Sequence, residues 1–477
     1  MRITVVVWVV GVLLLASCTS AHRTLSHKAM HKDLFRLERT IRKTHPAVGS
    51  TVSDKSLLEL RDNIDESLPQ QATTLEYAQL IYPLLDTVKG GHIGLYPRGA
   101  LWRHNYQSRK HVLPLTLKQL DNGQIVISAL KPSQDSLLLG AEVLLINGRP
   151  IKEIIAEANV FASGSDGTNK TGAHNRAITN LPTFLRWTEG KQDSFQVKLR
   201  TADMDSTLTV YSLAYATKNS KEAKIESRLR SKKQEKTINY GFDGSRKTAV
   251  IDLNSFSGYD PFNLVFPIAL KGVLAKAEKD SAETIILDLR GNGGGRSSNI
   301  LKVLRYFVKE QTTVFDPWTF PKSGWVRANP INKLIFTIPV LTGKNGTARF
   351  GRFMHHRVKP RKNSFDGKLI VLINSSSFSA ATITGSILKS NGRAILMGQE
   401  AGGNYHETYA GLFSMIGLRR TGFKVRMPHL LIPAAVNESR QPFGKTLQPD
   451  IFVPVTIEDV FDPRDRMLLQ ALELSDR

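Results

Sequence analysis

The second half of the chain alternates strand-like and helix-like segments, and this alternation restricts the fold more than any other feature. From residue 247 onward, "KTAVIDLNSF", "ETIILDLR", "KLIVLIN" and "AILMG" read as apolar strands. Between them lie helix-like segments such as "DPFNLVFPIALKGVLAKAEK", "SSNILKVLRYFV" and "SAATITGSILKS". Strands separated by helices predict a largely parallel sheet covered by helices, and therefore an α/β fold.

A glycine-rich segment, "DLRGNGGGRSS" (288–298), follows one of the predicted strands. Its glycines allow backbone N–H groups to approach a ligand closely. The segment does not fit the dinucleotide-binding fingerprint, because Arg296 stands where the third glycine belongs, and it lacks the Gly-Lys-Ser/Thr of a phosphate-binding loop. These failures disfavour a nucleotide-using enzyme, and a tight strand-to-helix turn is the plain alternative.

A serine-rich segment, "NSSSFSAATITGSILK" (374–389), follows another predicted strand, residues 368–373. Ser379 falls where that strand turns into a helix over residues 379–390, and a helix N-terminus has free N–H groups that stabilise an oxyanion. The earlier serines, Ser375, Ser376 and Ser377, are expected to cap or to form turn hydrogen bonds. Taken alone, Ser379 would also more often be a cap than a nucleophile.

The first half of the chain contains two further regions, which differ in their sequence patterns. Residues 30–88 are predicted to be helical, with Leu34, Leu37 and Ile41 on one stripe and Ser53 as an N-cap. Residues 110–212 alternate like strands around Asn-Gly turns, as in "GAEVLLINGRPIKEII" (140–155).

The N-terminus reads as an export signal. Arg2 precedes an uncharged run of fifteen residues, which is short for a membrane-spanning helix and ends in Leu-Ala-Ser-Cys. This ending resembles a bacterial lipobox, and Cys18 is the only cysteine of the chain. The sequence therefore predicts a lipidated Cys18 that anchors the protein to a membrane of the bacterial cell envelope, facing outside the cytoplasm, with no internal disulfide.

The formal net charge is +23, and part of the excess lies in "KNSKEAKIESRLRSKKQEK" (218–236). A nucleic-acid patch is one explanation. The export signal argues against it, so we expect an exposed basic linker that lies near anionic lipid headgroups.

The glycine-rich and serine-rich motifs together resemble those of the tail-specific, or C-terminal processing, serine peptidases. The Ile-Asn-Gly run likewise resembles a PDZ domain of the bacterial protease type. The resemblance implies an α/β fold: a crotonase-like ββα core with an N-terminal helical cap and a PDZ-like β-rich domain. The expected boundaries are signal peptide 1–17, cap 18–100, PDZ-like domain 101–215, basic linker 216–246 and peptidase core 247–477.

The same resemblance assigns the nucleophile to Ser379 and the oxyanion donors to the backbone N–H groups of Ala380 and Gly294. Thr382 replaces the glutamate that usually follows the nucleophile. Asn404 stands where one branch of the family has a lysine base, and an amide cannot accept the proton.

A second branch, resembling the tricorn protease core, uses a histidine that ends the cap. His92 in "LLDTVKGGHIGLY" matches this location, and His406 is the rival base. The carboxylate that would orient the histidine is left open among Glu400, Glu407 and Glu438.

The leading hypothesis is a lipid-anchored serine endopeptidase that cleaves polypeptides outside the cytoplasm. The alternative is an inactive peptide- or glycan-binding lipoprotein on the same scaffold, which the departures at Asn404 and Thr382 motivate. No cofactor, metal or nucleic-acid partner is predicted: the histidines of "HKAMH" (27–31) lack the zinc-protease glutamate. The oligomeric state is left open.

Overall fold

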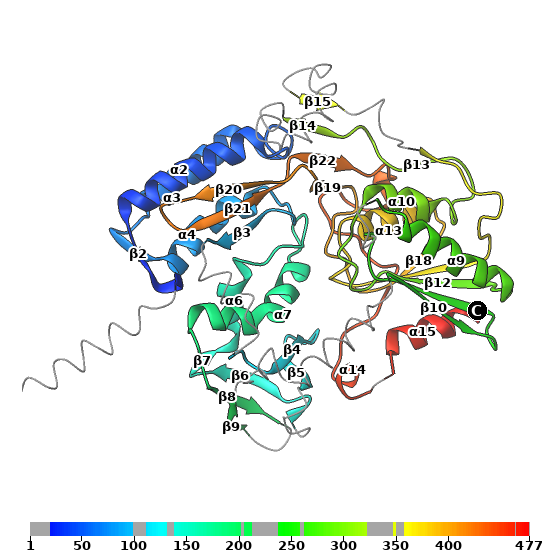
Figure 1. The fold of residues 1–477 in the computed structure, drawn as a ribbon, viewed down its shortest axis with the longest axis horizontal. Coiled ribbons are helices and arrows are strands. Elements are labelled where there is room, and N and C mark those ends of the chain that lie inside the picture. Colours follow the sequence, from blue (N-terminus) through cyan, green and yellow to red (C-terminus); the bar gives the residue numbers. More distant parts are fainter. Residues whose placement is uncertain are drawn as a thin grey trace, which may run out of the picture.

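The computed structural model describes residues 20–98, 111–130, 138–201, 205–211, 237–257, 262–321, 347–349, 357–462 and 464–476. The predicted signal peptide with Cys18 and the basic run 218–236 lie outside the described residues. Figure 1 shows three units: an N-terminal helical region, a β-rich unit, and a larger α/β unit that contains the C-terminal half.

The α/β unit is built on a six-stranded sheet in the order β10-β11-β12-β17-β18-β23. Only the β10–β11 pairing is antiparallel, so the predicted, largely parallel sheet is confirmed. The strands are β10 (Ile238–Asp243), β11 (Thr248–Leu253), β12 (Thr284–Asp288), β17 (Lys368–Ile373), β18 (Ile395–Gly398) and β23 (Ile451–Phe452). The first strand falls inside the predicted linker, so the linker ends before residue 238.

Helices cover both faces of this sheet, because alternate residues of each strand point to opposite sides. Ile285 and Leu287 of β12 share a core with α9 (Val265–Lys279), α10 (Ser297–Leu304) and α13 (Ala380–Ser390). Ile286, between them, packs with α15 (Arg466–Ser475) on the other face.

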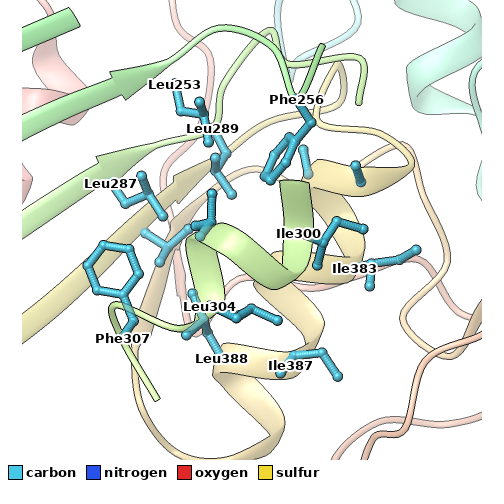
Figure 2. Packing of buried hydrophobic residues seen from close by; sticks show 14 of the residues in the cluster. Leu253, Phe256, Leu287, Leu289, Ile300, Leu304, Phe307, Ile383, Ile387 and Leu388 are labelled. Carbon is cyan, nitrogen blue, oxygen red and sulfur yellow. The ribbon is translucent and has the colours of Figure 1, made fainter. Parts of the chain in front are cut away.

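The core beneath α13 fixes the place of the serine-rich turn. Figure 2 shows Ile383 and Ile387 of α13 beside Ile300 and Leu304 of α10, over the strand residue Leu287. All five side chains are buried, and truncation of one such core isoleucine or leucine to alanine costs roughly 2–5 kcal/mol. The N-terminus of α13 is therefore held rigidly above the carboxyl ends of the parallel strands.

The cap combines N-terminal helices with strands from the second half of the chain. Its helices are α2 (His27–Thr44), α3 (Asp54–Glu66) and α4 (Thr74–Thr87), and Ser53 caps α3 as predicted. The helices pack on a three-stranded sheet, β20-β21-β3, formed by β3 (Gly94–Pro97), β20 (Ser414–Leu418) and β21 (Phe423–Met427). The predicted cap, residues 18–100, is therefore completed by a segment that follows the serine-rich turn.

The β-rich unit carries the sheet order β4-β5-β6-β8-β9 and two helices. Its elements are β4 (Leu115–Gln119), β5 (Ile125–Leu130), β6 (Glu142–Ile146), β7 (Arg149–Pro150), α6 (Ile151–Asn159), α7 (Thr171–Thr188), β8 (Ser194–Arg200) and β9 (Asp205–Tyr211). Asn147 and Gly148 both have positive φ, 51° and 79°, in the predicted tight turn.

The remaining elements lie around these units, and they include a four-stranded sheet in the order β15-β14-β22-β19. They are η1 (Ser20–His22), β1 (Thr24–Ser26), β2 (Gln71–Thr73), β13 (Thr312–Thr313), β14 (Thr319–Pro321), β15 (Thr347–Arg349), β16 (Arg357–Val358), β19 (Glu407–Ala410), β22 (Leu430–Pro433), η3 (Glu438–Arg440) and α14 (Glu458–Phe461). Within the described ranges, no helix is both long and apolar enough to cross a membrane.

Candidate active site

Ser379 occupies the sharp turn between β17 and α13 in a strained backbone conformation. Its φ is 57° and its ψ is −116°, a region that non-glycine residues enter at a cost of about 1–3 kcal/mol. Its hydroxyl does not cap α13, and it forms no hydrogen bond with any residue that the structure describes. The capping alternative therefore does not hold for this serine, and the half-buried hydroxyl is available for chemistry.

The neighbouring serines have structural roles. The buried Ser377 hydroxyl donates to the carbonyl oxygen of Leu289 (2.7 Å) and accepts from the N–H of Asn374 (3.0 Å), tying the two motifs together. The Ser375 hydroxyl accepts from the Asn175 side chain at 2.7 Å. Ser377 thus forms a turn hydrogen bond as expected, whereas the bond of Ser375 joins the turn to α7 of the β-rich unit.

The glycine-rich loop lies directly against Ser379. A Cβ atom added to Gly294 would be 2.7 Å from the Ser379 Cβ and 3.0 Å from the Ala380 nitrogen, and Gly294 has a φ of +100°. Only glycine allows this approach and this conformation. The motifs that the resemblance connects are therefore in contact in the structure.

The backbone N–H groups around Ser379 are not all free. The N–H of Ala380, at the first position of α13, donates to no described group. The N–H of Gly294, however, donates to the side-chain oxygen of Asn292 (2.9 Å), whose own amide group donates to the Leu253 carbonyl (2.6 Å). This hydrogen bond occupies the N–H that the sequence analysis assigned to the oxyanion hole. Gly293 and Gly295, on either side, line the cavity beside Ser379.

One cavity of about 430 Å³ brings Ser379 and His92 together. Ser379 and Ala380 line it from the α/β unit, and His92 lines it from the turn between α4 and β3. The two side chains come from positions nearly three hundred residues apart, and the shared cavity is what relates them.

Aromatic rings hold the imidazole of His92 in place. Its centroid lies 4.5 Å from that of Phe378, the residue before Ser379, and 5.9 Å from that of Phe413. Burial, followed by the positive charges of Arg426 and Arg176, lowers the pKa of His92 to about 3. The imidazole is therefore neutral at physiological pH, and a neutral imidazole can accept a proton.

A hydrogen-bonded chain runs from His92 to a buried carboxylate. The Thr408 hydroxyl donates to Oδ2 of Asp166 at 2.9 Å, so its oxygen faces Nδ1 of His92 (3.4 Å) as an acceptor. In the tautomer that carries its hydrogen on Nδ1, the ring can donate to this oxygen, and Nε2 then has the lone pair. The N–H of Gly91 donates to Oδ1 of Asp166 at 2.6 Å, and burial raises the pKa of Asp166 to about 7.

Asp166 and Thr408 were missed at the sequence level. Asp166 lies in the loop between α6 and α7 of the β-rich unit, in "SGSDGT", and Thr408 lies on β19. Neither stands in a motif or at a spacing that relates it to His92, so no signal in the sequence could have selected them.

The three carboxylates considered in the sequence analysis have other partners. Glu400 accepts hydrogen bonds from the side chains of Asn169 and Thr446, and Glu407 accepts from the Tyr409 hydroxyl at 2.9 Å. Glu438 begins η3, where its charge acts on His406. None of the three lines the cavity that holds Ser379.

His406, the rival base, is buried outside that cavity. Both ring nitrogens lack a hydrogen-bond partner among the described residues, and burial lowers the pKa of the ring. Its backbone N–H donates to the side-chain oxygen of Asn404 at 2.8 Å, so Asn404 has a structural role. The Thr382 hydroxyl donates to the Ser377 carbonyl (3.0 Å) and supports the same turn.

No group of three or more histidine, cysteine, aspartate or glutamate side chains is arranged to hold a metal ion in the described part of the chain.

Comparisons with known proteins bear on the family and the fold of the chain. Residues 247–451 match the model of peptidase family S41. The crystal structure of mature CPAF has a TM-score of 0.63 and 16% identity, over 94% of this chain and 97% of that chain. Mature CPAF complexed with lactacystin gives the same TM-score and identity, over 94% and 98% of the two chains.

A lower similarity links the chain to the photosystem II D1 C-terminal processing protease, with a TM-score of 0.43 and 12% identity over 90% of this chain and 96% of that chain. At 16% identity, the likeness to CPAF concerns the fold alone. A search among curated proteins found no match.

Proposed function

Because the chain belongs to peptidase family S41 and is a serine peptidase, we propose that Ser379 is its nucleophile and His92 its general base. The observation that carries the proposal is the single cavity of about 430 Å³ that both side chains line. The strained backbone of Ser379 and its hydroxyl, which does not cap α13, support the nucleophile. His92 is neutral and so able to take a proton, but its lowered pKa makes it a weak base in the empty cavity. His406, outside this cavity, is the less favoured base.

The proposed reaction is an acyl transfer in two halves. Nε2 of His92 takes the Ser379 proton while Oγ attacks the peptide carbonyl carbon. The resulting imidazolium gives that proton to the leaving amine as the peptide bond breaks. Water then attacks the acyl-enzyme with the same imidazole as base, which releases the acid product and restores the Ser379 hydroxyl.

The chain of hydrogen bonds to Asp166 supports His92 during this cycle. When His92 becomes an imidazolium, its Nδ1–H donates to Thr408, and the Thr408 hydroxyl donates to Asp166. Because the pKa of Asp166 is about 7, its ionised form is available at neutral pH and above, and it then stabilises the positive charge, as the aspartate of a serine-protease triad does directly. Asp166 and Thr408 are therefore proposed as positioning residues that act through His92.

The oxyanion of the tetrahedral intermediate is proposed to accept a hydrogen bond from the N–H of Ala380 at the start of α13. The second donor is proposed from the glycine-rich loop. The N–H of Gly294 would have to give up its hydrogen bond to Asn292 before it could donate to the oxyanion. Gly293 and Gly295 line the cavity and take no part in that hydrogen bond. Loss of one such donor costs about 2.7–4 kcal/mol of transition-state stabilisation.

A fluorophosphonate probe tests the nucleophile. The wild type should be labelled and should cleave an unfolded casein, and Ser379→Ala should do neither. Ser376→Ala is the matched control, because this half-buried serine lies in the same turn. Labelling that persists in Ser379→Ala would reject the assignment. Binding of casein by the wild type without any cleavage would favour the inactive peptide-binding alternative.

The β-rich unit is proposed to act as a PDZ-like module that gathers the substrate C-terminus by strand addition and carboxylate capture. The Ile-Asn-Gly turn supports this proposal. Fluorescence anisotropy with Ser379→Ala should show tighter binding of a peptide with a free C-terminal carboxylate than of its amide. Equal binding of the two peptides would contradict the proposal.

The location is proposed to be the bacterial cell envelope, with the protein anchored through a lipid on Cys18 and acting on polypeptides outside the cytoplasm. Labelling cells with a radioactive fatty acid tests the anchor. The wild type should carry label and Cys18→Ala should not, whereas equal labelling of both would refute the anchor.

A further inference from the structure

Two arginines from distant elements line the same cavity as Ser379 and His92. Arg176 comes from α7 of the β-rich unit, and Arg426 comes from β21 of the cap sheet. No aspartate or glutamate is among the described residues that line this cavity. The two arginines are therefore the charged side chains among these lining residues, and the reaction as proposed above uses neither guanidinium.

Both guanidinium groups are held by packing. The Arg426 guanidinium lies over the ring of Phe413, 3.8 Å from the centroid, and Phe413 in turn lies beside His92. The Arg176 guanidinium lies on the backbone of Gly164, where an added Cβ atom would be 2.7 Å from its central carbon. An arginine held in this way loses little conformational entropy when it binds a carboxylate.

Apolar side chains from the α/β unit make up another part of the lining. They include Ile300 of α10, Ile383 of α13 and Ile432 of β22. Figure 2 shows Ile300 of α10 and Ile383 of α13 side by side. The cavity thus offers charge beside the base and apolar surface beside α10 and α13.

The position of the arginines relative to His92 selects one side of the scissile bond. The imidazole must deliver its proton to the leaving amine, so groups beside it contact the leaving-group side of the substrate. The charges of Arg426 and Arg176 both act on this ring. We infer that Arg176 and Arg426 form a carboxylate-binding subsite that selects substrates with a negative charge just after the cleaved bond. This inference rests on the proposed function of Ser379 and His92.

A bound carboxylate would also help the base. The two arginine charges disfavour the imidazolium, and a substrate carboxylate between them would offset that effect. A substrate with the right charge would therefore improve both binding and proton transfer, so its effect should appear in kcat as well as in KM.

Two sources can supply the carboxylate. One is the side chain of an aspartate or glutamate within the substrate. The other is the C-terminal carboxylate of a substrate cut close to its end. The chemistry at the arginines is the same, and matched peptides distinguish the two sources.

The test begins with a pool of synthetic peptides with amidated C-termini, in which mass spectrometry identifies a peptide that the wild type cleaves. Two pairs are then made from it. In the first pair, glutamate or glutamine occupies the first or second position after the cut, and the C-terminus is amidated. In the second pair, the peptide ends two residues after the cut as a free acid or as an amide.

The wild type should prefer the charged member of at least one pair by about tenfold in kcat/KM, the size expected of a charge-assisted hydrogen bond. Arg176→Gln and Arg426→Gln should reduce that ratio towards one, and Arg426→Lys should retain part of it. Lys424→Gln is the matched control: Lys424 is a partly buried cation two residues away on β21, outside the cavity, and its loss should leave the ratio unchanged.

A wild type that cleaves the charged and neutral members equally overturns the inference alone, as does an arginine variant that folds and keeps the full preference. Circular dichroism reports whether the variants fold. If they do not, loss of the wild-type preference in high salt supports the subsite, and a preference that salt leaves unchanged overturns it. A wild type that cleaves no peptide, and resists fluorophosphonate, overturns the proposed function together with the subsite.

Discussion

The side of the cavity that carries the proposed nucleophile (the nucleophile side) and the side that carries the proposed base (the base side) are built in different ways. Ser379, Ala380 and the glycine-rich loop sit at the carboxyl ends of neighbouring strands of one sheet, β12 and β17. His92, Asp166 and Thr408 come from three separate elements, which meet only where the cap, the β-rich unit and the α/β unit pack together.

The difference affects how each side responds to change. The nucleophile side is held by strand pairing and by the core under α13, so Ser379 keeps its strained geometry within one unit. The base side depends on contacts between units, including the hydrogen bond of 2.6 Å from Gly91 to Asp166. We therefore expect the nucleophile side to be rigid before substrate binds, and the base side to be sensitive to changes in the β-rich unit.

The largest expected effect tests whether His92, which lines the cavity, is the general base. His92→Gln should lower kcat by roughly 10²–10⁴-fold, the usual contribution of a general base, and should leave the cavity intact. His406→Gln should leave kcat close to that of the wild type, because His406 lies outside the cavity. Steady-state hydrolysis of casein or of a cleaved peptide measures both, and the reverse pattern would assign the base to His406.

The next largest effect tests whether the nucleophile side depends on the close contact between Gly294 and Ser379. Gly294→Ala should lower kcat by about 10²–10³-fold, because the added methyl group meets Ser379 and shifts the oxyanion donors. Gly293→Ala is the control in the same loop, since a Cβ atom there meets nothing within 4 Å. Comparable losses in the two variants would show that the loop, rather than its contact with Ser379, controls activity.

A smaller effect tests the chain of hydrogen bonds on the base side. Thr408→Val removes a hydroxyl that links His92 to Asp166 and should lower kcat by about tenfold, with KM little changed. Thr408→Ser restores the hydroxyl and should recover most of the loss. If Thr408→Ser fails to recover activity, the loss in Thr408→Val comes from a change in packing and not from the missing hydroxyl. The proposed role of Asp166 would then be wrong.

The smallest expected effect is on how the stability of the folded protein depends on pH. The pKa of His92 is about 3 in the folded protein and near 6.5 in the unfolded chain, so the unfolded chain binds more protons between these values. The contribution of His92 to stability is therefore lost as the pH falls from 6.5 towards 3. The urea midpoint of the wild type should fall more steeply over this range than that of His92→Gln.

The contribution of Asp166 to stability should change with pH in the opposite direction to that of His92. Its pKa is about 7 in the folded protein and near 3.8 in the unfolded chain, so the folded protein binds more protons between these values. Its contribution is present at low pH and is lost as the pH rises through 7. Asp166→Asn should therefore make the acid-side loss of stability steeper than in the wild type, and a shallower loss would contradict the burial-raised pKa.

Local patterns predicted the nucleophile side well. The strand at residues 368–373 and the α13 helix are confirmed within one residue, because an apolar run and a helical period are properties of neighbouring residues. The N–H of Gly294 was assigned without its partner Asn292, because a side-chain hydrogen bond of this kind leaves no periodic signal.

By itself, the sequence determined the α/β class, the serine at the head of a helix and a glycine-rich turn after a strand, since each follows from short-range chain geometry. The contact between that turn and the serine was implied only by the family resemblance, and the structure shows it. Only the tertiary structure decided which carboxylate lies behind His92, how β20 and β21 complete the cap, and that two arginines reach the same cavity. Those relations join residues hundreds of positions apart. They arise because the buried apolar faces of separate units can pack together in only one way, and no local pattern records that packing.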